Sequence, residues 1–120
     1  MIKKKIQLTK FQIRALLDLN EKYSTSIEQF IDTSINKGIS SYDGSENTKN
    51  IFLKYSRKRD FPPFNLGNVT IMILSRIYDS LSAISKELDI KKSDLIRAFI
   101  TIGILSTEDT DIIMQEKNSA

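Results

Sequence analysis

Cysteine and histidine are both absent from this chain of 120 residues. Without cysteine there are no disulfides, no thiol nucleophile and no cysteine-based zinc site. Without histidine the chain lacks the commonest general base and the commonest transition-metal ligand. The acidic residues are scattered without a paired site, and there is no glycine-rich loop to cradle a phosphate. We therefore predict a protein that is not an enzyme and that uses no cofactor, no metal ion and no small-molecule substrate.

Long hydrophobic runs are missing as well. No stretch approaches the roughly 18 apolar residues of a membrane span, and the N-terminus lacks the apolar core of a signal peptide. We expect an intracellular, cytoplasmic protein with no membrane partner. A chain of 120 residues forms one domain or two very small ones. A unit of about 40 residues cannot bury an adequate core alone, so two such units would have to share one.

The net charge of +3 is unevenly distributed along the chain. Residues 1–39 hold seven basic and four acidic side chains, residues 40–67 five and three, and residues 68–105 five and four. Residues 106–120 hold one basic and four acidic side chains. A basic body with an acidic tail favours a polyanion as the partner of the body.

One apolar pattern extends over residues 68–105. Residues 69–73 alternate between apolar and polar, which is typical of a strand with one buried face. Residues 77–88 carry the apolar stripe of an amphipathic helix, with Ser75 as its expected cap. After a break at 89–92, a second and more apolar helix is predicted, with its end marked by Gly103.

The same layout occurs upstream, over residues 3–39, at one constant offset. Thr9 is the expected cap of a helix that runs to Tyr23 and buries a face that includes Leu17. Ser26 and Gln29 have the spacing of a capping box at the start of a second helix, which is expected to stop near Gly38. The pairs that are identical between the two copies are Ile6/Ile71, Leu16/Leu81, Ile31/Ile96, Ile35/Ile100, Gly38/Gly103 and Ile39/Ile104. A common register for all these features indicates an internal duplication, with units at 1–39 and 68–105.

Residues 40–67 join the two units. Their first part, 40–50, is polar and predicts an exposed linker. Residues 51–60 combine apolar with basic side chains and predict a short helix packed on the domain. Its basic cluster is either a solvated face or a patch that contacts phosphate groups, and its members are Lys54, Arg57, Lys58 and Arg59. The acidic tail, residues 106–120, is expected to be a flexible end or a weak docking segment.

The order of strand, helix, tight break and second helix resembles the ribbon-helix-helix family of DNA-binding proteins, which includes the Arc and MetJ repressors. The resemblance rests on IQLTKFQIRALLDLNEKYSTSIEQFIDTSI in the first copy and on VTIMI, LSRIYDSLSAISKEL and KKSDLIRAFI in the second. It implies a mainly α fold with a short two-stranded antiparallel β-ribbon, in which the helices interlock in one core. It also implies that the ribbon enters the major groove of double-stranded DNA.

The resemblance assigns roles to residues by their position. The implied base-reading residues face outward on the strands: Lys3, Lys5 and Gln7, and Asn68, Thr70 and Met72. The implied phosphate clamps lie at the starts of the second helices: Ser26 and Ile27, and Lys91, Lys92 and Ser93. Two of these depart from the family pattern. Met72 replaces a polar reader and suits apolar contact with a thymine methyl group. Lys91 replaces a Ser or Thr cap, so this clamp is expected to depend on side-chain charge.

Family members are homodimers, whereas here two different halves lie on one chain. We therefore predict that the copies pair within the chain as a tandem pseudo-dimer that prefers an asymmetric DNA site. When fully extended, the linker spans roughly 90 Å, more than a small domain needs. The alternative is domain exchange, in which each copy pairs with its counterpart on a second chain.

The predicted function is transcription regulation by sequence-selective binding to double-stranded DNA, with repression by promoter occlusion as the expected mode. Longer operators would require self-association of several protomers on DNA. The alternative is a protein-interaction module, because antitoxins and plasmid-partition proteins share this DNA-binding fold while an extra segment engages a partner. By analogy, a small tandem protein of this kind suits a virus or another mobile element, and would then act in the host cytoplasm.

Overall fold

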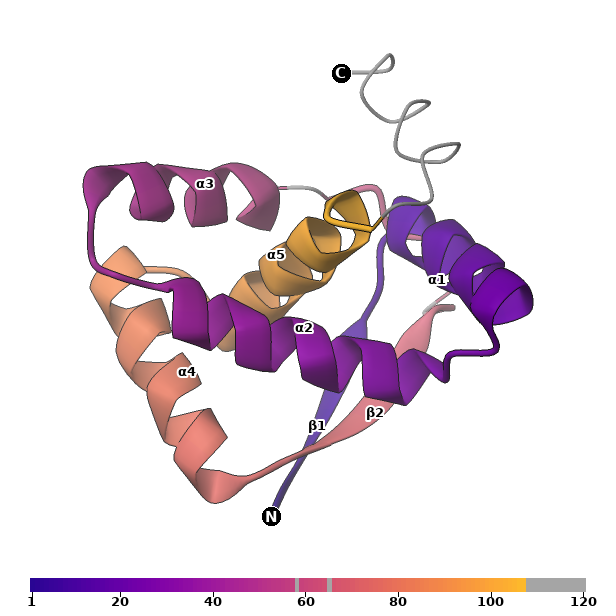
Figure 1. Ribbon diagram of the computed structural model, residues 1–120, viewed down its shortest axis with the longest axis horizontal. Coiled ribbons are helices and arrows are strands. Elements are labelled where there is room, and N and C mark those ends of the chain that lie inside the picture. Colours follow the sequence, from indigo (N-terminus) through magenta and orange to yellow (C-terminus); the bar gives the residue numbers. More distant parts are fainter. Residues whose placement is uncertain (58, 65, 108–120) are drawn as a thin grey trace.

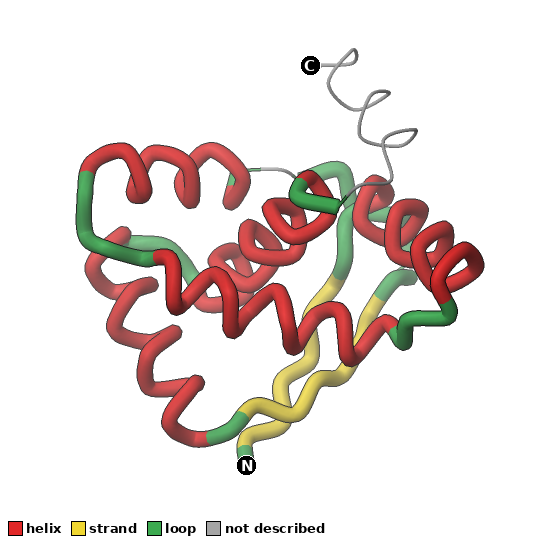
Figure 2. Tube along the Cα trace, in the orientation of Figure 1, coloured by secondary structure: helices red, strands yellow, loops and turns green. Residues whose placement is uncertain are grey.

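The computed structural model describes residues 1–57, 59–64 and 66–107 (Figure 1). In these ranges the elements are β1 (Ile2–Gln7), α1 (Lys10–Tyr23), α2 (Ile27–Ser41), α3 (Glu46–Ser56), β2 (Asn68–Ile73), α4 (Ser75–Leu88) and α5 (Lys92–Leu105). The two strands form one antiparallel sheet, and the helices gather on one side of it (Figure 2). This confirms the predicted mainly α class with a short antiparallel ribbon.

The ribbon joins one segment from each sequence copy. Lys5 of β1 lies opposite Thr70 of β2, and Ile6 lies opposite Val69. Ile6 and Ile71 are almost fully buried, at 2% and 5% exposed, so the strands turn their apolar residues toward the helices. Lys5 and Thr70 are related by the same sequence offset as Ile6 and Ile71. The pairing register is therefore centred on equivalent residues of the two copies.

The first helices of the two copies match from end to end. The offset that relates the copies carries both bounds of α1 (Lys10–Tyr23) onto those of α4 (Ser75–Leu88). Each helix is followed by a residue in the left-handed conformation, Ser24 with φ 54° and Asp89 with φ 57°. The backbone N–H groups of these two residues donate to carbonyls of the last helical turn. The copies therefore share their helix-terminating geometry as well as their apolar pattern.

Two predictions about these helices were wrong. Ser75 does not cap α4, because Leu74 occupies the N-cap position and makes no side-chain cap bond. Leu17 is 55% exposed and does not belong to the buried face of α1. Successive helical residues are about 100° apart, and the buried face is already centred on Ala15, Leu16 and Leu19.

Gly38 and Gly103 do not end their helices, contrary to prediction. α2 continues to Ser41 and α5 to Leu105. A Cβ on Gly38 would clash with the ring of Phe99, and a Cβ on Gly103 would clash with the hydroxyl of Ser34. Ser34 and Phe99 are themselves equivalent positions of the two copies, so the two clashes are reciprocal. The glycines allow α2 and α5 to cross closely in the middle of the shared core.

The short helix predicted over residues 51–60 corresponds to α3, which begins earlier, at Glu46, within the part predicted to be an exposed linker, and packs on α5. Phe52 of α3 stacks on Tyr42, with ring centroids 5.7 Å apart, and meets the ring of Phe99 edge-on at 4.9 Å. At its start, the Asp43 carboxylate accepts hydrogen bonds from Ser45 N and Thr48 Oγ1, which lowers the pKa of Asp43 to about 2. Because α3 covers its outer side, α5 is buried nearly all round, whereas the outer side of α2 is polar and exposed.

Candidate nucleic-acid interface

The outward face of the ribbon carries the six residues predicted to read DNA bases. Residues that lie directly opposite each other on antiparallel strands point to the same face, and alternate residues along a strand do so too. The pairs on the outward face are Lys3/Met72, Lys5/Thr70 and Gln7/Asn68. Gln7 is half-buried and the other five are exposed. The structure thus brings all six together on one face, with its two positive charges on β1.

Gln7 is held from both sides at the end of the ribbon. Its Nε2 donates to the carbonyl oxygen of Leu66 at 3.4 Å, and its own carbonyl oxygen accepts from Nη1 of Arg97 at 3.1 Å. The adjoining backbone is tied as well, because Leu8 N donates to Gly67 O at 2.9 Å. These contacts fix where the linker meets the ribbon, and they orient one side chain of the outward face.

The starts of α2 and α5 were predicted to hold phosphates. Ser26 caps α2, and its hydroxyl accepts from Gln29 N at 3.0 Å, while Ile27 is the first helical residue. At α5, Lys91 occupies the cap position without a side-chain cap bond. Helix N-termini attract anions through their free N–H groups and the helix dipole. Both helix starts can therefore attract an anion. The start of α2 has a hydroxyl cap, whereas the start of α5 has lysine charge beside it.

The residues that follow Lys91 are less exposed than Lys91 itself. Lys92 places its Nζ 5.3 Å from the ring centroid of Tyr78, and Ser93 is half-buried. The next residue, Asp94, is 5% exposed and is paired with Arg97 and Arg59. Asp94 is therefore neutralised within the protein, which leaves the lysines to set the local charge at this helix start.

The basic cluster of the linker does not extend the ribbon face. Lys54 and Arg57 are exposed at the end of α3, which lies across α5 from the ribbon in Figure 1. Arg59 donates to Asp94 Oδ2 at 3.0 Å and so has a structural partner. Lys58 lies outside the described residues. The cluster is thus divided between a distant exposed pair and an arginine that anchors the linker.

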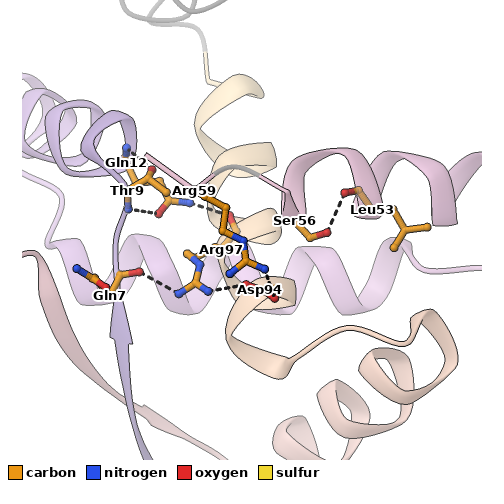
Figure 3. A network of polar contacts seen from close by, with 8 residues as sticks. All are labelled: Gln7, Thr9, Gln12, Leu53, Ser56, Arg59, Asp94 and Arg97. Carbon is orange, nitrogen blue, oxygen red and sulfur yellow. Dashed lines mark hydrogen bonds and ion pairs between the residues drawn. The ribbon is translucent and has the colours of Figure 1, made fainter. Parts of the chain in front are cut away.

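A buried polar network was not anticipated from the sequence (Figure 3). Gln12 is fully buried, and its Nε2 donates to Arg97 O at 2.9 Å and to Thr101 Oγ1 at 3.0 Å. Its Oε1 accepts from Thr9 N at 3.0 Å, which completes a capping box at α1. Arg97 pairs with Asp94 and lies 4.9 Å from the ring centroid of Phe61. The available signal was the interruption of apolar stripes by Gln12 and Arg97.

Among the residues that the structure describes, the network occurs in one of the two predicted copies. The offset between the copies relates Gln12 to Ile77, Asp94 to Gln29 and Arg97 to Asp32. The network joins α1, α5, β1 and the linker, and its counterpart around α2 has neither the buried arginine nor a linker segment. The network therefore supports the ribbon on the side of α5 and has no equivalent on the side of α2.

No family model, curated protein or solved structure matches the chain. Among the described residues, no three His, Cys, Asp or Glu side chains are grouped so as to hold a metal ion. Nor is any helix in that part of the chain long and apolar enough to cross a membrane.

Proposed function

We propose that this protein is a sequence-selective double-stranded DNA-binding regulator of transcription, acting as a repressor, with the β1–β2 ribbon in the major groove. The observation that carries the proposal is the outward face, on which Lys3, Lys5 and Gln7 lie beside Thr70 and Met72. The major groove accepts a two-stranded ribbon and presents a distinct pattern for each base pair. A pair of strands alone is only marginally stable, and here buried helices support it from beneath.

We further infer that the chain is a tandem ribbon-helix-helix pseudo-dimer. Three features support this. The ribbon register is centred on the equivalent residues Lys5 and Thr70, the bounds of α1 and α4 are related by the same offset, and the crossing contacts of Gly38 and Gly103 are reciprocal. Domain exchange with a second chain is not needed, because the two strands already pair within one chain.

The two strands have different roles in the proposed complex. Lysines and glutamine on β1 supply charge and hydrogen bonds, whereas Met72 on β2 supplies apolar contact with thymine methyl groups. The helix starts at Ser26 and at Lys91 hold phosphates on either side of the ribbon and fix its register. A regulator of this kind prefers a non-palindromic site.

The proposal is tested by selecting, from a random pool, the DNA duplexes that the protein binds. The selected site is then titrated with protein at several salt concentrations. We expect one short asymmetric site that survives competition by scrambled DNA. Lys5→Ala is the informative variant and Lys86→Ala, an exposed lysine on α4, is its matched control. If Lys5 contacts a base, Lys5→Ala weakens binding to the site about 10-fold or more and relaxes selectivity at one position. If it contacts phosphate, the salt slope falls by about one and all sequences weaken alike.

The control variant is expected to bind like the wild type. Coating of all duplexes without preference, or equal binding by the wild type and Lys5→Ala, would count against a ribbon in the major groove.

A further inference from the structure

Phe64 is an exposed aromatic residue of the linker. Its side chain is 90% exposed, and its backbone has φ 59°, a conformation that is unfavourable for a bulky residue. Pro62 and Pro63 precede it, and Leu66 N donates to Pro63 O at 3.3 Å across the turn. Burial of this exposed ring by a partner would remove apolar surface from water, which is favourable.

A pocket of about 290 Å³ lies between α2 and β2. Ile31, Ile35, Ile71 and Met72 provide its apolar lining, and Glu28 and Asp32 provide acidic side chains. An engineered cavity of about 150 Å³ accommodates benzene, so this pocket has room for a phenyl ring. Phe64 of the same chain does not fill the pocket, since its ring is almost fully exposed.

The region between α5 and β1 is the counterpart of this pocket in the other predicted copy, and it is covered by the linker. There, between α5 and β1, the linker supplies Phe61, which lies over Arg97, and Arg59, which pairs with Asp94. The single linker serves only that side. The pocket beside α2 is therefore an uncovered counterpart of a site that already receives an aromatic and a basic side chain.

We propose that the pocket between α2 and β2 receives Phe64 from a second copy of this chain. Charge complementarity favours this occupant. Residues 57–64 carry three basic side chains and one acidic side chain, and of these Arg57 is exposed while Arg59 is paired with Asp94. The pocket presents Glu28 and Asp32. Because the ring and the pocket are different surfaces of one chain, the contact is heterologous and extends from copy to copy. This self-association goes beyond the proposed function and requires no DNA.

Sedimentation of the DNA-free protein tests the contact. One aromatic anchor on a small interface gives weak association, so the range extends to about 1 mM protein. We expect the average mass of the wild type to rise with concentration above the 13.7 kDa of one chain. Phe64→Asn removes the ring while favouring the same backbone conformation, and Asp32→Arg reverses the charge at the pocket. Each of these variants is expected to remain monomeric.

Mixing the two variants gives the decisive measurement. Phe64→Asn keeps an intact pocket and Asp32→Arg keeps an intact ring, so an equimolar mixture should form heterodimers while neither variant associates alone. Leu17→Ser and Asp79→Arg, at exposed positions of α1 and α4, are matched controls that should associate like the wild type. A wild type that stays monomeric at about 1 mM overturns the proposal. So does unchanged association of either variant, or a mixture that remains monomeric.

Discussion

Replacing the buried Gln12 by methionine tests the one-sided polar network. Methionine has a similar length and no branch at Cβ, so the change removes hydrogen bonds with little change in volume. It leaves Thr9 N, Arg97 O and Thr101 Oγ1 without their side-chain partner. An unsatisfied buried group costs about 1–3 kcal/mol. Since Thr101 retains a rotatable hydroxyl and methionine recovers apolar contact, we expect a loss of about 3 kcal/mol in the free energy of unfolding.

Urea unfolding followed by circular dichroism measures this loss. With a slope of about 2 kcal/mol per molar urea, a loss of about 3 kcal/mol lowers the midpoint by about 1.5 M. Gln29→Met is the matched control, because the same substitution at an exposed residue of α2 should change stability by no more than about 0.5 kcal/mol. A loss below about 1 kcal/mol for Gln12→Met would refute the argument that the network holds α1 against α5.

Three other predictions concern α3, the helix crossing and the DNA face. The pKa of the Asp43 carboxylate is lowered to about 2. Its contribution to stability is therefore present above the ordinary pKa of about 3.9 and is lost as the pH falls toward 2. Acid titration of the wild type should show this loss of stability, and Asp43→Asn should not show it. Gly38→Ala should lower the free energy of unfolding in urea by about 1–2 kcal/mol, although alanine is the better helix former. Phe99→Leu in the same chain should relieve part of this loss, since the added Cβ clashes with the ring of Phe99. Full stability of Gly38→Ala would contradict the close crossing of α2 and α5. In the proposed DNA complex, Met72→Gln should shift selectivity at one base pair from thymine toward adenine by about 10-fold, as measured by competition between duplexes, and unchanged selectivity would remove Met72 from base contact.

The repeat was predicted from local periodicity, which the sequence alone provides. Alternating residues such as Val69 and Ile71 predict a strand, and apolar stripes at helical spacing predict helices wherever those segments lie in the chain. The sequence also predicted which strand residues face outward, since Ile6 and Ile71 alternate with Lys5 and Thr70. The mainly α class and the outward face could both be predicted for this reason.

Helix ends and contacts depended on partners that are distant in sequence. Glycine often ends a helix, but Gly38 and Gly103 lie inside theirs because another helix crosses at each. Leu17 belongs to a plausible apolar stripe, yet it is exposed because the core of α1 is centred on neighbouring residues. No local pattern distinguishes these outcomes.

Local patterns in the sequence were enough to predict the strands, the helices and the residues on each face of the ribbon, because neighbouring residues set secondary structure and its periodicity. The differences between the two halves came from contacts between residues that are distant in sequence. These contacts joined Gln12 to residues of α5 and placed the linker's Arg59 and Phe61 on one side of the ribbon, leaving a pocket on the other. The physical reason is that a buried polar group must find a partner in space, and a single linker covers only one of two equivalent positions.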